Sequence, residues 1–252
     1  MLRARVIPCL LVQNRRLVKT TRFADPKYVG DPINAIRIFN DKEVDELLVL
    51  DITATRESRP PDFELVADFA EECFMPLCYG GGIRTLEDAS RLFALGVEKV
   101  AIQTAAMQDL SVITAISERY GRQSVVVSVD LKRNWRGSPL LYSAARRKTL
   151  RRPWAEFVRD AVAAGAGEII ANAVHRDGTM MGMDLDLVRE TAADVDVPVI
   201  AAGGVGSLED IRAALDAGAS AVGVGAFFVF HGPHRAVLIT YPEYKQLEAL
   251  LR

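Results

Sequence analysis

The sequence predicts an α/β protein with one domain over residues 1–252, a single (β/α)8 TIM barrel. The first observation is the length of 252 residues with 50% hydrophobic content, which is the usual size of one eight-stranded α/β barrel. The second is that eight short β-branched segments alternate with amphipathic ones, with no Ser/Gly-rich linker between them. The third is an internal repeat close to half the chain length. A doubly wound sheet is the alternative architecture.

The eight strands are expected at residues 5–11, 46–52, 75–79, 97–104, 123–131, 167–174, 197–202 and 219–226. Most are nearly continuous apolar runs, as in parallel strands buried on both faces. Helices are expected between them. Asp31-Pro32 begins one, with a capping residue before Pro at the first helical position. Ser207 with Asp210 begins another as a capping box, and Asp184 precedes a third that ends before Val195.

The repeat relates two glycine-rich segments at an offset of 122 residues. Residues 81–88 read Gly-Gly-Ile-Arg-Thr-Leu-Glu-Asp, and residues 203–210 read Gly-Gly-Val-Gly-Ser-Leu-Glu-Asp. The same offset maps Gly96 onto Gly218 and Val100 onto Val222 without a gap. We therefore expect two homologous half-barrels, at about residues 1–122 and 123–252.

Composition excludes several classes of protein. The net charge of −2 argues against a dedicated nucleic-acid binder, and no apolar run approaches the 18 residues of a membrane span. The N-terminus shows no signal-peptide pattern, and three cysteines in apolar context favour reduced thiols in the cytoplasm. Three scattered histidines give no zinc-ligand spacing. We expect no metal, no cofactor, no nucleic acid and no membrane.

Two phosphate sites are expected at the barrel mouth. In each repeat a strand ends in a Gly pair, Gly81-Gly82 or Gly203-Gly204, before a short turn and a capped helix. Glycine lets the backbone approach an anion, whose oxygens free N–H groups then bind. The neighbouring strands end in Gln103-Thr104 and Gly225-Ala226. Two such sites suit a ligand with a phosphate at each end, although the glycines alternatively serve only tight turns.

Many short segments of the chain match one known family: Arg5–Leu10, Leu17–Lys19, Gly30–Pro32, Asp45–Leu47, Leu50–Ala54, Gly80–Ile83, Lys99, Thr104–Ala106, Asp130, Gly165–Glu168, Arg176–Thr179 and Ala202–Gly204. On these segments the chain resembles, almost end to end, the cyclase subunit of imidazole glycerol phosphate synthase. The resemblance implies a barrel that takes ammonia from a separate glutaminase docked on its N-terminal face. It also implies a bis-phosphorylated substrate, which the ammonia splits and cyclises into imidazole glycerol phosphate and aminoimidazole carboxamide ribotide.

One departure from that family concerns its chemistry. The family uses two aspartates as acid and base, and Asp130 matches the second, but the first falls on Leu11. Leucine cannot transfer a proton, and loss of a positioned acid or base typically lowers a rate by roughly 10²- to 10⁴-fold. Further departures are Gln103, His175 and Ala226, where the family usually has Asn, Asp and often Ser.

A paralogous group fits better. The segments at residues 8–11, 32–35, 74–79 and 234–239, with Tyr241-Pro-Glu-Tyr244, resemble the cyclase-like proteins of surface-polysaccharide gene clusters. That resemblance implies acetamidino modification of a sugar, with a glutaminase and a sugar amidotransferase as partners.

The remaining candidates carry two interpretations each. Lys19 resembles a substrate-ordering lysine of a flexible loop but is alternatively a solvated charge, and Asp51 and Asp177, followed by Gly178, are either substrate contacts or caps. Asp130 is either a surviving acid/base or a hydrogen-bonded strand-end carboxylate. His175 is more often only a polar contact. The basic run at residues 146–152 either closes over a phosphorylated ligand or is solvated.

Four charged residues at strand beginnings resemble the family's ammonia gate: Arg5, Glu46, Lys99 and Glu168. Two positive and two negative charges can pair mutually, whereas the alternative is a solvated lower rim. Above this ring we expect an apolar interior lined by Val49, Ile102, Val127 and Ile170.

Three functions compete. The chain is an ammonia-channelling barrel for sugar amidation, an authentic histidine-pathway cyclase that tolerates Leu11, or a scaffold without chemistry. Leu11 argues against the second function and the four gate residues argue against the third.

Overall fold

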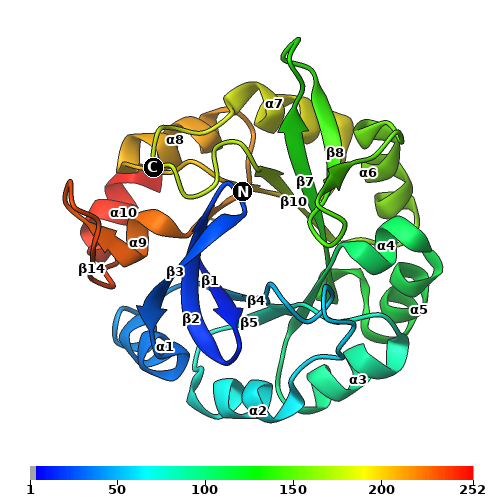
Figure 1. The fold of residues 1–252 in the computed structure, drawn as a ribbon, viewed down its shortest axis with the longest axis horizontal. Helices are drawn as coiled ribbons and strands as arrows, with labels where there is room; N and C mark the ends of the chain where they lie inside the picture. The colour runs from blue at the N-terminus through cyan, green and yellow to red at the C-terminus, as the bar shows by residue number, and fades with distance from the viewer. Residues whose placement is uncertain (1–3, 252) are drawn as a thin grey trace.

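Eight parallel strands close into a barrel in the computed structural model, which describes residues 4–251. β1 pairs with both β12 and β4, and β7 pairs with β10, so the sheet has no open edge. Figure 1 shows the ring of strands with helices around it. The predicted (β/α)8 fold is confirmed, with all eight strands within the expected segments or overlapping them: β1 (Arg5–Gln13), β4 (Leu47–Asp51), β5 (Leu77–Gly80), β6 (Lys99–Ile102), β7 (Val125–Arg133), β10 (Glu168–Ala173), β11 (Val199–Ala202) and β12 (Ala221–Val224).

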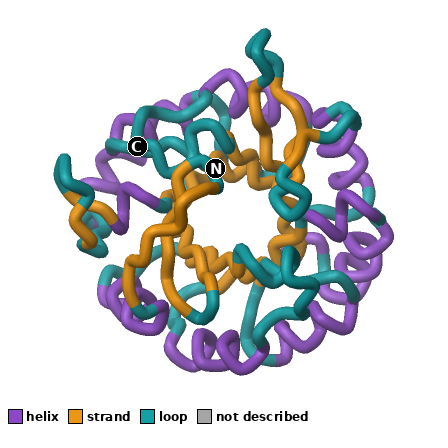
Figure 2. The backbone as a smooth tube through the Cα atoms, in the orientation of Figure 1, coloured by secondary structure: helices purple, strands orange, loops and turns teal. Residues whose placement is uncertain are grey.

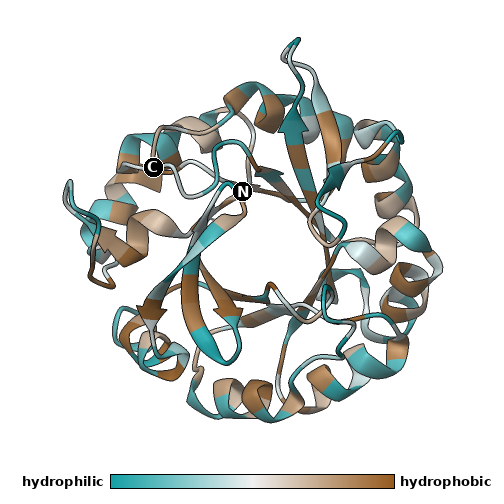
Figure 3. Cartoon of the chain, in the orientation of Figure 1, coloured by the Kyte–Doolittle hydropathy of each residue, from teal (hydrophilic) through white to brown (hydrophobic). Residues whose placement is uncertain are grey.

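Helices cover the outside of the barrel, as the purple segments of Figure 2 show. The long ones are α1 (Pro32–Asp41), α2 (Phe63–Glu72), α3 (Leu86–Ala94), α5 (Ser111–Tyr120), α6 (Trp154–Ala163), α7 (Leu185–Asp194), α8 (Leu208–Asp216) and α10 (Tyr244–Leu251). Two short helices, α4 (Thr104–Gln108) and α9 (Ala226–Val229), and a 3-10 turn η1 (Arg122–Ser124) complete the set. In Figure 3 hydrophobic and hydrophilic residues alternate along these helices. None of the helices within residues 4–251 is long and apolar enough to span a membrane.

Side-chain caps fix where the predicted helices begin. Asp31 accepts a hydrogen bond from the backbone N–H of Asn34 at 2.9 Å, immediately before Pro32. Thr85 and Ser207 form matching capping boxes with Asp88 and Asp210. The two glycine-rich segments therefore fold alike at equivalent places, while the division into homologous half-barrels stays a prediction.

Three hairpins extend from the barrel beyond the predicted elements. β2 (Arg16–Thr21) continues from β1 and pairs with β3 (Ala24–Gly30). β7 pairs with β8 (Pro139–Ser143), which pairs in turn with β9 (Lys148–Thr149). β13 (Phe230–His231) pairs with β14 (Ala236–Val237). The first two hairpins continue from the C-terminal ends of β1 and β7, whereas β13 follows the short helix α9 and its hairpin lies at the outer edge of the molecule in Figure 1.

The strands separate two apolar layers. One layer lies between the barrel and the helices and includes Phe39, Phe69 and Phe157. The other fills the interior, and its members are small or branched: Ile7, Leu48, Cys78, Ala101, Val126, Ile170, Ile200 and Ala221. Because side chains alternate across a strand, four of these residues lie two positions beyond the charged strand beginnings: Ile7, Leu48, Ala101 and Ile170.

The predicted interior lining was wrong at three of four positions. Ile170 belongs to the interior cluster, but Val49, Ile102 and Val127 pack in the outer layer. Each of the three stands three positions from a residue that faces the interior: Val49 from Glu46, Ile102 from Lys99 and Val127 from Asp130. The strand pleat therefore turns their side chains toward the helices.

Candidate active site at the barrel mouth

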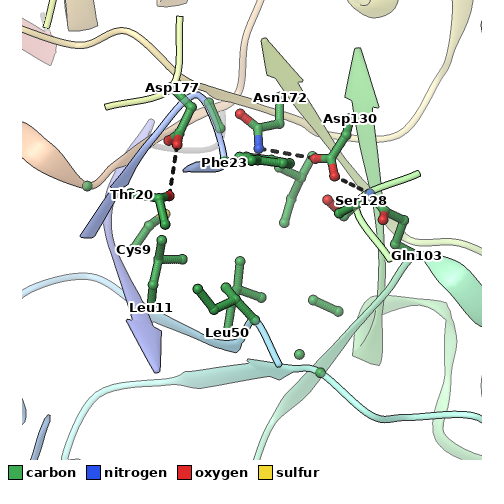
Figure 4. A pocket seen from close by; sticks show the side chains of 18 of the residues that line it. Cys9, Leu11, Thr20, Phe23, Leu50, Gln103, Ser128, Asp130, Asn172 and Asp177 are labelled. Atoms are coloured by element: carbon green, nitrogen blue, oxygen red, sulfur yellow. Dashed lines mark hydrogen bonds between the residues drawn. The ribbon is translucent and has the colours of Figure 1, made fainter. Parts of the chain in front are cut away.

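A cavity of about 230 Å³ lies at the C-terminal ends of the barrel strands. Figure 4 shows that its two walls differ. Leu11 and Leu50 line one side with Cys9, whereas Asp130 and Asn172 line the facing side. The cavity therefore offers hydrogen-bonding groups from β6, β7 and β10 and apolar surface from β1 and β4.

Asp130 is the acid at the centre of the polar wall. It is buried, with 4% of its surface exposed, and accepts hydrogen bonds on both carboxylate oxygens. Gln103 donates to Oδ2, and Asn172 donates through Nδ2 to Oδ1 at 3.1 Å. Burial raises the pKa of the Asp130 carboxyl to about 7, although both hydrogen bonds oppose the rise. Such a group exchanges a proton near neutral pH, as a general acid or base must.

Leu11 occupies the place across the cavity from Asp130. Its backbone pairs with Leu50 of β4 and Val18 of β2, so its side chain is held in the apolar wall. No second carboxyl faces Asp130 from β1, whose residues at the cavity are Cys9 and Leu11. The geometry therefore provides one proton-transferring carboxyl at this position rather than a facing pair.

Lys19 and Asp177 form an ion pair inside the mouth. The Lys19 ammonium lies 2.9 and 3.1 Å from the two Asp177 oxygens, and the lysine is only 5% exposed. Thr20 also donates to Asp177, at 3.4 Å. The alternative of a solvated loop charge at Lys19 is therefore wrong, because β2 turns this side chain into the cavity.

Asp51 borders the cavity but is occupied by its own turn. Its Oδ1 accepts from the N–H and hydroxyl of Thr53, at 2.9 and 2.8 Å, and from the N–H of Ala54 at 3.0 Å. Arg59 approaches its other oxygen at 3.6 Å. Of the two interpretations of Asp51, the structure shows the capping contacts.

Both glycine pairs lie where the backbone must pass very close to other atoms. A β-carbon on Gly81 would come within 2.4 Å of the Asp51 carbonyl oxygen, and one on Gly204 within 2.2 Å of the Gly182 carbonyl oxygen. Gly81, Gly82, Gly203 and Gly204 all have positive φ angles and all line the cavity. A side chain at these positions would be strained as well as crowded.

Two pairs of helices begin near the glycine pairs. In α3 and α8 the backbone N–H groups of Asp88 and Asp210 are bonded to the cap side chains of Thr85 and Ser207. By contrast, α4 and α9 begin without a side-chain cap, and their first residues, Thr104 and Ala226, line the cavity beside Gln103 and Gly225. The two short helices therefore leave uncapped N–H groups at the cavity, at the strand ends already named from the sequence.

At the opposite end of the barrel Arg5, Glu46, Lys99 and Glu168 close into a ring. Arg5 bonds both Glu46 and Glu168. Lys99 bonds Glu46 at 3.0 Å and Glu168 at 2.9 Å. Burial disfavours the charge on Lys99, but the two carboxylates more than offset this and raise the pKa of its ammonium group. The predicted convergence of these side chains at the N-terminal face is confirmed, and the alternative of a solvated rim is wrong.

Known proteins share this fold and sequence over nearly the whole chain. A family model described as histidine biosynthesis protein matches residues 5–233. A Pseudomonas aeruginosa protein, named provisionally as imidazole glycerol phosphate synthase subunit hisF2, is 53% identical over 249 residues, 98% of this chain and 99% of its own. The imidazole glycerol phosphate synthase subunit HisF of Hyphomonas neptunium is 42% identical over 234 residues, 91% of each chain.

The chain belongs to the HisF family of histidine biosynthesis proteins. A Leptospira interrogans protein, also provisionally named as subunit HisF, is 44% identical over 253 residues, 99% of each chain. These relatives therefore cover the mouth and the charged ring alike.

Two sequence candidates of this HisF-family chain lie outside the mouth. His175 lines a neighbouring pocket, where its Nε2 is 3.2 Å from Asp184, and burial lowers its pKa despite that carboxylate. Of the basic run at residues 146–152, only Arg147 lines the cavity, while Arg152 pairs with Asp160 on α6. Of this run, only Arg147 is therefore placed to cover a ligand in the cavity.

The sequence interpretation of this HisF-family barrel missed Asn172. Its Nδ2 bonds Asp130, and its Oδ1 is buried without a hydrogen-bond partner. The signal was available, because Asn172 stands two residues beyond Ile170 and four beyond Glu168 on one strand and so shares their interior face.

Proposed function

We propose that this barrel is the ammonia-receiving subunit of a glutamine amidotransferase that serves acetamidino-sugar formation for a surface polysaccharide. A separate glutaminase docks on the N-terminal face and supplies ammonia through the charged ring. A sugar amidotransferase is a further partner, and the free cysteines are consistent with a cytoplasmic location. The observation that carries the proposal is the combination of an intact ring with Leu11 in place of an acid.

The interior supports the conduit. Above the ring, the interior side chains are apolar or small up to the level of Cys9, Leu50 and Ala202. Two of them are thiols, and burial raises the pKa of Cys9 to about 12, so it stays neutral. A small uncharged molecule can cross such a layer, whereas ammonium would lose its hydration there.

The mouth supports a reaction other than the family's cyclisation. Only Asp130 can transfer a proton at the position where the family pairs two aspartates. A phosphorylated ligand would meet the uncapped starts of α4 and α9, with Lys19 and Asp177 at the rim. A structure obtained with inorganic phosphate should show the anion at Gly81-Gly82 or at Gly203-Gly204. Water alone at both places would argue against a phosphorylated ligand.

The histidine-pathway cyclase is the second candidate function. The names of the relatives favour it. The proteins from Hyphomonas neptunium and Streptococcus sanguinis, 42% and 40% identical, are named as subunits of this synthase, and the hisF2 protein, 53% identical, carries the same name provisionally. Leu11 opposes it for the reason already given. The ring opposes a scaffold, since a scaffold does not require four converging charges.

Two parallel assays separate these candidates. In the first, the purified chain receives the bis-phosphorylated histidine intermediate and excess ammonium, and formation of imidazole glycerol phosphate is followed beside an authentic HisF subunit. In the second, the chain is combined with its glutaminase, the sugar amidotransferase, glutamine and the N-acetyl sugar. We expect slow turnover in the first assay and acetamidino product in the second only when the barrel is present. Authentic turnover in the first would overturn the proposal.

Lys99→Ala tests the conduit. Removing this ammonium opens the ring and leaves the two glutamates repelling each other, so ammonia escapes or fails to enter. The glutamine-dependent rate should fall roughly tenfold, while the rate with saturating ammonium is largely retained. Equal loss of both rates would leave a structural role for the ring.

A further inference from the structure

The segment that follows the matched family region reaches back to the barrel mouth. The family match ends at residue 233, and β14 then pairs with β13 beyond a turn that contains Arg235. Arg235 has a φ of 50°, an uncommon backbone conformation for a non-glycine residue. A tight hairpin that imposes such a conformation fixes both the side chain and the carbonyl group of the residue.

The side chain of Arg235 contacts the loop between β10 and α7. One terminal nitrogen donates to the carbonyl oxygen of Gly178 and, at 3.2 Å, to that of Thr179. These two carbonyls directly follow Asp177, whose carboxylate holds Lys19. The guanidinium therefore anchors the backbone on which Asp177 stands.

The backbone of Arg235 contacts the hairpin on the other side of the mouth. Its carbonyl oxygen accepts a hydrogen bond from Lys27 of β3 at 3.2 Å. The Lys27 ammonium and the Arg235 guanidinium also lie 5.1 and 5.7 Å from the centre of the Phe230 ring, within cation–π range. A single residue thus bridges the hairpin β2–β3 and the loop at residues 174–184.

The hairpin and the loop meet closely at Gly178. A β-carbon there would lie 2.2 Å from the Thr20 carbonyl oxygen, so the two backbones are in direct contact. The backbone N–H of Arg22 donates to the Asp177 carbonyl at 2.9 Å. Lys19 stays buried in the cavity only while this contact holds, because its strand is an extension outside the closed barrel.

We propose that Arg235 is a positioning residue, which staples the β2–β3 hairpin to the Gly178–Thr179 backbone and so keeps Lys19 and Asp177 in the barrel mouth. Arginine suits this task because the two hydrogens of one planar NH2 group can each bond a carbonyl while the guanidinium stays near the Phe230 ring. Lysine would keep the positive charge but lacks this planar group. The consequence for turnover rests on the proposed function, whereas the consequence for the hairpin does not.

Amide hydrogen exchange of the full chain tests the staple without any enzymatic assay. Arg235→Met removes the guanidinium and keeps an apolar side chain of similar length beside Phe230. Exchange at residues 16–30 and 175–180 should become about tenfold faster, while α5 across the barrel is unchanged. Arg235→Lys should give an intermediate rate. His234→Ala, in the same turn, is the matched control and should match the wild type.

The outcomes separate the staple from general stability and from the proposed function. Unchanged exchange at residues 16–30 in Arg235→Met, or an equal change in His234→Ala, would overturn the proposal. If Arg235→Met does not fold, the exchange rate at residues 16–30 in Arg235→Lys is compared with the wild type and with His234→Ala instead. In the ammonia-dependent assay, Arg235→Met should raise KM about tenfold with a smaller effect on kcat, and Arg235→Lys should partly restore it. Failure of the assay for every variant, with the exchange result intact, would count against the proposed function alone.

Discussion

The two ends of this barrel carry polar groups on the same interior face of the strands, but they satisfy those groups differently. At the N-terminal end, two cations and two carboxylates bond one another in a closed ring. At the C-terminal end, Asp130 faces Leu11, and the amide oxygen of Asn172 is buried without a partner. Buried polar groups are normally paired, so the ring is complete without a ligand and the mouth is not. Stability is thus concentrated at one end and chemistry at the other.

The largest expected effect comes from breaking the ring. Glu168→Gln keeps the shape of the side chain but leaves Arg5 and Lys99 with a half-buried excess of positive charge. The free energy of unfolding should fall by about 3 kcal/mol, measured by urea denaturation. The control is Asp186→Asn, which breaks the exposed pair with Arg189 and should have a negligible effect. Similar losses in both variants would show that the ring contributes no more than a surface pair.

Leu11→Asp tests the mouth by restoring a second carboxyl across from Asp130. Any residual cyclase rate should rise roughly 10²-fold, since two positioned groups can then share proton transfer. Leu50→Asp places a carboxyl in the same apolar wall on the neighbouring strand and should give no comparable gain. An equal gain from both substitutions would mean that the location of the new carboxyl, across from Asp130, does not matter.

The pH dependence of stability separates Asp130 from the ring. Its pKa is raised to about 7 in the folded chain, so the folded state binds this proton more tightly than the unfolded state. The resulting stabilisation is full at pH values below the unfolded pKa of about 4 and is lost as the pH rises through about 7. Asp130→Asn removes this dependence. Its free energy of unfolding relative to wild type should therefore increase by about 2 kcal/mol between pH 5 and pH 8. A constant difference would refute the raised pKa.

The smallest expected effect is on the proton affinity of Asp130 itself. Gln103→Met removes one hydrogen bond that favours the ionised carboxylate, so the pKa of Asp130 should rise further, with less than a tenfold change in proton affinity. Carbon-13 carboxyl shifts followed by NMR during a pH titration would report it. Asn172→Leu removes the bond to the other oxygen and should act in the same direction. A fall in pKa in either variant would contradict the assigned donors.

Periodicity and capping predicted most of the fold, because each strand and helix carries its own local signal. The charged ring was expected from the family resemblance, and the position of its four residues at strand beginnings agreed with it. The β2–β3 hairpin was not, because its polar strands gain their order from contacts with residues 177 and 235. The partners of Asp130 come from strands separated by 27 and 42 residues, and only barrel closure brings them together. Val49, Ile102 and Val127 were assigned to the wrong face of their strands, although counting positions along each strand in the sequence would have placed them correctly.

The row of side chains along β10 sets how much the barrel interior can hold. Glu168 of the ring and Asn172 of the mouth are four residues apart, which is about 13 Å along an extended strand. Between them stands only Ile170, and the surrounding layer is packed. An interior this short and this full leaves no room to store a small molecule. In the proposed conduit, each ammonia molecule released below the ring would have to be consumed at the mouth before the next could follow. The proposed function therefore requires that the output of the glutaminase and the demand of the acceptor be matched in time.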